Sequence, residues 1–160
     1  MDMKQAQSAM DQAASLHADD LAPTDFQQAV KTWAHAQAAV QEGKIDTAKV
    51  LFVSAKIYFN KSAVIAKAKR DALSRELNTM QLMIGSNFAE VKSDLSKSGV
   101  SPKLKGRVQA IVSEVEEGNA TISKLVDQED FLKAVATAKD VQMKIYNAQL
   151  MLAGQRPAGK

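Results

Sequence analysis

Residues 45–95 read IDTAKVLFVSAKIYFNKSAVIAKAKRDALSRELNTMQLMIGSNFAEVKSDL, and apolar side chains recur within them mostly every three, four or seven residues. This spacing places them on one face of an α-helix, because the helical repeat is 3.6 residues. The stretch has no proline, and an unbroken helix of this length would extend for about 75 Å. The sequence therefore predicts an all-α protein, a helical bundle of about five helices built around one long central helix, with antiparallel hairpins. The residues of the predicted apolar face are Ile45, Ala48, Phe52, Ala55, Phe59, Ala66, Leu73, Leu77, Met80, Ile84, Phe88, Val91 and Leu95.

The weakest part of this predicted helix is Gly85-Ser86-Asn87. Glycine in a helix interior costs about 1 kcal/mol relative to alanine, and a serine can cap the start of a new helix. The apolar spacing nevertheless continues from Leu77 to Leu95 across the glycine. Two interpretations remain open, a continuous or bent helix and a break that folds the same segments into a more compact bundle.

Turn-forming residues divide the rest of the chain into further helices. Thr24 is suited to an N-cap, and Gln27 three residues later would complete a capping box. Gly43 and Gly99 are suited to the left-handed residue that follows a helix, and Ser101-Pro102 supplies a cap followed by a proline in the first turn. The expected helices are 3–18, 25–42, the long helix from 46, one that begins after Ser101 and continues through residue 126, and 129–153.

We expect a single helical domain, 1–153, with possible sub-bundles 1–75 and 76–153, followed by a flexible tail, 154–160. One spacing pattern occurs twice, 86 residues apart. A duplicated helical hairpin would produce this repetition, and so would the helical period that both segments share. The matched positions are Ile45, Ala48, Phe52 and Ala55 in the first segment and Phe131, Ala134, Ala138 and Val141 in the second.

The composition excludes several classes of chemistry. The chain of 160 residues has no cysteine, which excludes disulfides, thiol catalysis and cysteine-based metal centres. It has two histidines, and its glycines form neither a phosphate-binding loop nor a dinucleotide motif. We therefore expect no enzyme activity, no catalytic residues, no cofactor and no metal. His17 lies near Asp19 and Asp20, but we interpret this group as a solvated helix end.

The chain is mildly basic, with a net charge of +3 at pH 7, and the segment from Lys56 to Arg75 is rich in lysine and arginine. Three interpretations of these positive charges remain open. They could form the solvated side of an amphipathic helix, bind an acidic protein partner, or bind nucleic acid or another anionic polymer. Most of the aromatic side chains are expected in the core, whereas two tyrosines could line a groove with their hydroxyls in water. The candidate partner-binding or polymer-binding residues are Lys49, Lys56, Tyr58, Lys67, Arg70 and Tyr146.

The segment LAPTDFQQAVKTWAHAQAAVQEGKIDTAKVLFVSAK, residues 21–56, carries an alanine ladder and the turn Gly43-Lys44-Ile45-Asp46. It resembles an Ala-rich helical-hairpin, tetratricopeptide-like domain family of bacterial envelope proteins and lipoproteins, over about residues 21–72. The resemblance implies a non-catalytic scaffold or adaptor that binds a protein partner in the periplasm or cell envelope, with a cytoplasmic location as the alternative. It supplies no catalytic residues. We expect no transmembrane segment and no signal peptide in the sequence as it stands, and a homo-oligomer is possible.

Overall fold

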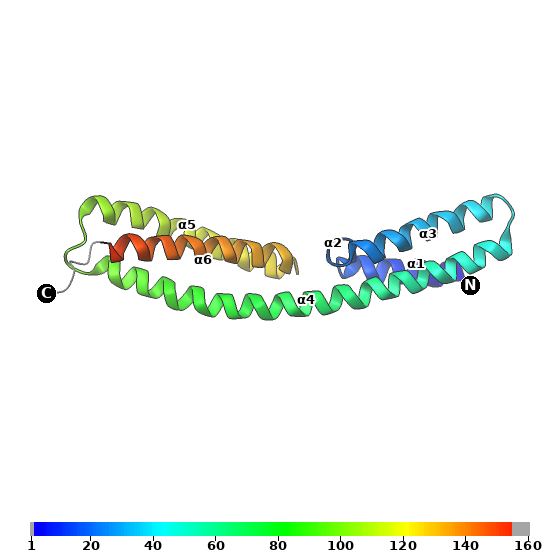
Figure 1. Cartoon of the computed structure of the whole chain (residues 1–160), viewed down its shortest axis with the longest axis horizontal. Coiled ribbons are helices and arrows are strands. Elements are labelled where there is room, and N and C mark those ends of the chain that lie inside the picture. The colour runs from blue at the N-terminus through cyan, green and yellow to red at the C-terminus, as the bar shows by residue number, and fades with distance from the viewer. Residues whose placement is uncertain (1, 155–160) are drawn as a thin grey trace. The chain divides into compact units, whose positions relative to one another are not determined.

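A computed structural model describes residues 2–154, which form six α-helices and no β-strand (Figure 1). The all-α prediction is confirmed. The chain divides into two compact units, one up to Asp71 and one from Ala72, and the long helix contributes residues to both. The helices are α1 (Asp2–Ser15), α2 (Ala18–Leu21), α3 (Pro23–Gln41), α4 (Ile45–Ser96), α5 (Pro102–Asp127) and α6 (Phe131–Ala153).

Helix α4 is continuous through Gly85, so the interpretation with a break at this glycine is wrong. The apolar residues on both sides of the glycine, Ile84 and Val91 among them, are buried in one core. Gly85 itself is exposed, and a Cβ atom added there would have no other atom within 4 Å. Burial of the flanking residues therefore outweighs the low helix propensity of a single glycine.

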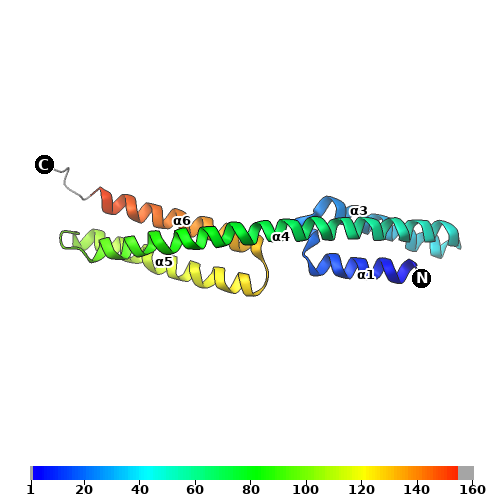
Figure 2. The ribbon, with the colours of Figure 1, turned by 90° about the horizontal axis from the view of Figure 1, so that it is seen from below.

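The first unit packs α1 and α3 against the N-terminal part of α4 (Figure 2). Its core combines alanines, which let helices approach closely, with a few aromatic rings that fill the remaining space. Trp33 of α3 meets Phe52 of α4 edge to face at 5.0 Å between ring centroids, and Phe26 meets Phe59 in the same way at 5.6 Å. The fully buried alanines of this unit are Ala6, Ala13, Ala18, Ala29, Ala36, Ala55 and Ala66.

The second unit packs α5 and α6 against the C-terminal part of α4, and its core is largely aliphatic. An ion pair between exposed side chains joins each pair of helices, and each contributes at most about 1 kcal/mol to stability. The stability of this unit therefore comes chiefly from its buried Leu, Ile and Val residues. The ion pairs are Lys92–Glu116 between α4 and α5, Lys139–Glu76 between α4 and α6, and Lys144–Glu114 between α5 and α6.

The turns from α3 to α4 and from α5 to α6 have the same construction, 86 residues apart. Gly43 and Glu129 both adopt left-handed φ angles, 73° and 57°. Five backbone hydrogen bonds correspond one to one, including Lys44 N–H to Ala39 C=O and Asp130 N–H to Leu125 C=O, both 2.9 Å. The repetition seen in the sequence therefore corresponds to two helical hairpins with one turn geometry.

The N-terminal region differs from the expected helix 3–18. Helix α1 ends at Ser15, His17 takes a left-handed conformation with φ 52°, and the short α2 follows. The prediction of Thr24 as an N-cap is wrong, because α3 begins at Pro23 and Thr24 lies within its first turn. Proline fits the first helical position for two reasons. Its ring holds φ near the helical value, and a backbone N–H at this position would have no partner within the helix.

The other helix boundaries lie near their expected places. Ser101 caps α5, accepting a hydrogen bond from Leu104 N–H, and Asp130 caps α6 in the same way through Lys133 N–H. Gly99 has the expected positive φ of 108°. Of the expected flexible tail, only Gly154 is described, as the residue that ends α6, and residues 155–160 lie outside the described part of the chain.

Candidate protein interface

Helix α4 carries a second apolar face in the first unit, formed by four β-branched residues. Val50, Val53, Ile57 and Val64 are separated by three, four and seven residues, so they share one side of the helix. Their exposed fractions lie between 44% and 70%. These four residues are termed the outer face of α4.

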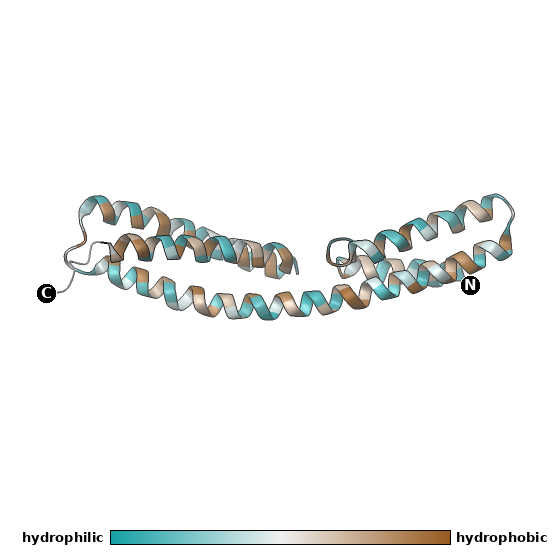
Figure 3. Ribbon diagram, in the orientation of Figure 1, coloured by the Kyte–Doolittle hydropathy of each residue, from teal (hydrophilic) through white to brown (hydrophobic). Residues whose placement is uncertain are grey.

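The outer face lies opposite the side of α4 that packs into the core. Three of its residues each follow a buried residue by two positions, a rotation of about 200° around the helix. A surface helix needs one apolar face to pack on its own protein, and the other side is normally polar. In the first unit the side of α4 away from the core is apolar as well. Figure 3 shows the apolar and hydrophilic bands that follow one another along α4. The three pairs of buried and exposed residues are Ala48 with Val50, Ala55 with Ile57, and Ser62 with Val64.

Lysines border the outer face on both sides. Lys49, Lys56 and Lys67 follow one another at intervals of seven and eleven residues, which places all three along one edge. The ammonium group of Lys49 pairs with Asp46 at 3.3 Å, and that of Lys56 donates a hydrogen bond to Gln5 Oε1 at 2.8 Å. The edge is therefore basic, although two of its three amines also have partners within the unit.

Lys61 borders the opposite edge of the outer face. Its ammonium group lies 2.7 Å from a carboxylate oxygen of Asp25 on α3. The hydrogen bond and the charge of Asp25 raise the pKa of Lys61 above its usual value. Lys61 is therefore positively charged at neutral pH and links α4 to α3 through this ion pair.

The remaining predicted site residues do not gather around the outer face of α4. Arg70 is half-buried toward the packed side of the helix, and Tyr58 is half-buried on α4. Tyr146 belongs to α6 in the second unit and is 55% exposed. The two tyrosines thus belong to different units.

Helix α6 also carries an exposed apolar side, which includes Tyr146. Its members Leu132, Met143, Tyr146 and Leu150 are about half exposed, and they are termed the outer face of α6. The core side of α6 is filled by residues such as Ala148 and Leu152, and Leu150 lies away from it. The two outer faces correspond in part at the 86-residue interval. Met143 matches Ile57 and Leu150 matches Val64, whereas Lys139 stands at the position equivalent to Val53.

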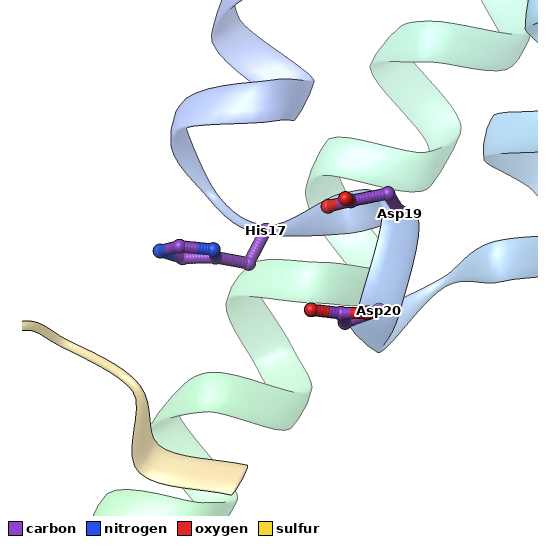
Figure 4. A group of neighbouring side chains, drawn as sticks. All are labelled: His17, Asp19 and Asp20. Atoms are coloured by element: carbon purple, nitrogen blue, oxygen red, sulfur yellow. The ribbon is translucent and has the colours of Figure 1, made fainter. Parts of the chain in front are cut away.

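His17, Asp19 and Asp20 are brought together at the turn between α1 and α2, and they project to the same side of the chain (Figure 4). One ligand atom from each lies within 4.8 Å of the others, and all three residues are exposed. A structural zinc site needs four protein ligands. Within residues 2–154 no fourth histidine, cysteine or acidic residue joins this group, so we assign no metal to it.

A shallow groove of about 370 Å³ lies between α1 and α4. Ligand pockets are usually enclosed and mostly apolar, whereas this groove is open and its lining is mainly amide, hydroxyl and ammonium groups. It therefore has the character of a hydrated seam between helices. Its lining residues are Lys4, Gln5, Ser8, Ala9, Gln12, Lys56 and Asn60.

The apolar residues of the outer face of α4 were missed as site candidates in the sequence. Their signal in the sequence is that Val50, Ile57 and Val64 recur every seven residues. The buried residues Ala48, Ala55 and Ser62 recur at the same interval, two positions earlier. The apolar spacing in the sequence predicts one apolar face for the helix and leaves the opposite side to solvent. Ile45, included in that single face, is in fact 51% exposed at the start of α4.

Within residues 2–154, no helix combines the length and the apolar character that crossing a membrane requires. Comparisons with known protein families, with curated proteins and with solved structures find no match to this chain.

Proposed function

We propose that this protein is a non-catalytic helical docking module that binds a protein partner through the exposed apolar sides of its hairpins. The observation that carries the proposal is the outer face of α4, where Val50, Val53, Ile57 and Val64 remain in water opposite a complete core. Contiguous exposed apolar patches on soluble proteins mark interaction sites more often than isolated exposed residues do. The periplasmic or envelope location implied by the resemblance to envelope hairpin proteins belongs to the same proposal.

The proposal is tested by site-specific photo-crosslinking in the organism that carries the gene. A photo-reactive amino acid is placed at Ile57 or Met143 in the outer faces, and at Gln37, an exposed polar position on α3, as the matched control. We expect discrete, protease-sensitive adducts from the two outer-face positions and none from Gln37. Equal labelling at all three positions would contradict the proposal.

The same experiment distinguishes a protein partner from an anionic polymer, which is the alternative that the basic residues of the sequence allow. Polymer binding through the basic edge predicts adducts that nucleases or polymer-degrading enzymes remove, with yields that fall steeply as salt is raised. Adducts that persist in high salt and disappear with protease would support the docking module. Nuclease-sensitive adducts alone would overturn it.

A further inference from the structure

The outer face of α4 has the register of a two-helix packing surface. Val50, Ile57 and Val64 recur every seven residues, and Val53 lies three residues after the first of them. In heptad notation these are three a positions and one d position, whereas the later d positions hold the polar residues Asn60 and Lys67. Apolar residues at a positions insert between the side chains of a partner helix. From Val50 to Val64 the face is about 21 Å long, a length that one partner helix can cover.

Lysines occupy the positions that flank such a packing surface. Lys49 and Lys56 each precede an a position and are therefore g residues, and Lys61 is an e residue on the other edge. In helix pairs the e and g residues face those of the partner and select it by charge. A partner helix with glutamate or aspartate at its own e and g positions would complement these lysines.

The same lysines oppose pairing with a second copy of this helix. A parallel, in-register pair would place Lys56 of one copy against Lys61 of the other, twice per dimer. An antiparallel pair would set the edge that carries Lys49 and Lys56 against the same edge of the second copy. Like charges at these positions destabilise a complex and so select against self-association.

We propose, building on the docking function above, that the occupant of the outer face of α4 is an amphipathic helix of another protein with an apolar heptad face and acidic flanks. The four apolar residues supply the buried contact, and Lys49, Lys56 and Lys61 set the charge preference. Lys61 of α4 pairs with Asp25 of α3, so its ammonium group lies at the edge of the outer face before the partner arrives.

The test uses the whole chain and a defined probe. The probe is a fluorescent 21-residue helical peptide with Ile and Leu at a and d and Glu at e and g, which repels itself and stays monomeric. A second peptide has the same a and d residues and Lys at e and g. We expect fluorescence anisotropy to show binding of the acidic peptide at least about tenfold tighter than binding of the basic one.

Two variants locate the binding surface. Ile57→Glu places a charge in the middle of the outer face, and we expect it to weaken binding of the acidic peptide by at least about tenfold. Leu82→Glu is the matched control, because Leu82 is an exposed apolar residue of α4 outside the outer face, and it should bind as the wild type does. Circular dichroism confirms that both variants remain folded, as their exposure predicts. Equal weakening by both variants would overturn the assignment.

A charge exchange tests the flanks separately from the apolar contact. The double variant Lys49→Glu/Lys56→Glu should lose its preference for the acidic peptide and gain affinity for the basic one. Equal binding of both peptides to the wild type would overturn the acidic partner and leave the docking function intact, since crosslinking at Ile57 tests that function independently. A dimer of this chain that Ile57→Glu dissociates would also overturn the proposal, because a second copy would then be the occupant.

Discussion

Replacing Gly118, in the middle of α5, by alanine is predicted to lower the stability of the protein, although alanine normally stabilises a helix. A Cβ atom at this position would lie 2.4 Å from Cγ2 of Val141 on α6, well inside the usual carbon–carbon contact distance of about 3.5 to 4.0 Å. Val141 is 2% exposed, and its β-branched side chain has little freedom to rotate away. Gly118→Ala must therefore displace α5 from α6 or strain Val141.

The magnitude follows from two opposing effects. Overpacking a core costs about 1 to 3 kcal/mol, whereas replacing a helical glycine by alanine gains up to about 1 kcal/mol. We therefore expect Gly118→Ala to lower the free energy of unfolding by about 1 to 2 kcal/mol. Gly106→Ala is the control on the same helix, because a Cβ there would meet no other atom within 4 Å, and it should raise stability by up to about 1 kcal/mol.

Urea denaturation followed by circular dichroism measures both changes, and a double-mutant cycle with Val141→Ala identifies the contact. Val141→Ala alone should cost about 2 kcal/mol through lost burial and a cavity. In the double variant the new methyl group occupies part of that cavity, so the two effects should couple favourably by about 1 to 3 kcal/mol. If Gly118→Ala stabilised the protein as much as Gly106→Ala does, the proposed close contact between α5 and α6 would be refuted.

Three further predictions concern the long helix. Gly85→Ala should raise the unfolding free energy by up to about 1 kcal/mol, because the position is helical and unobstructed, and denaturant titration would show a loss instead if the chain turned there. Phe52→Asp should unfold the first unit, since it buries a charge against Trp33, and an unchanged Trp33 fluorescence melting curve would contradict this. The ion pair with Asp25 raises the pKa of Lys61 in the folded protein. The contribution of this pair to folding stability is therefore present below the pKa that Lys61 has in the unfolded chain, and it is lost as the pH rises through the pKa of the folded state. The stability difference between wild type and Lys61→Gln should therefore shrink above about pH 10.5, and a difference that grew with pH would exclude this linkage.

Sequence patterns predicted the helices well where residue chemistry marks a boundary. Gly43 and Gly99 lack a side chain and so suit a left-handed residue after a helix, and the hydroxyl of Ser101 suits an N-cap. The structure confirms all three roles. Glu129 takes the same left-handed role as Gly43 without the glycine that would reveal it. The conformation of Glu129 accompanies the backbone hydrogen bonds of this turn, and a glutamate gives no local sequence signal for it.

The outer face of α4 shows a different limit of sequence interpretation. Helical periodicity says which residues share a side of a helix, but both sides of α4 between Ala48 and Val64 are apolar. The aromatic residues Phe52 and Phe59 mark one side as the core. Whether the other side is also covered depends on where α1 and α3 pack, and no periodicity within α4 contains that information. Charge in the sequence indicates Lys49, Lys56 and Lys67 along one edge of α4 and does not indicate the apolar residues beside them.

The two hairpins allow packing requirements to be distinguished from surface requirements within one chain. The position equivalent to Gly118 is Thr32, and the position equivalent to Val141 is Ala55, so in each hairpin a smaller residue on one helix is matched with a larger one on the other. Core packing explains this exchange, because total volume must be conserved where residues are buried.

No such requirement acts on exposed positions, where a polar residue would serve the fold equally well. Ile57 and Val64 on α4 nevertheless correspond to Met143 and Leu150 on α6, and all four are largely exposed. Apolar character is thus shared at these two pairs of positions, where folding gains little from it, although Lys139 stands at the position equivalent to Val53. Contact with another molecule would give these positions a reason to be apolar, and it is the reason that the docking function supplies.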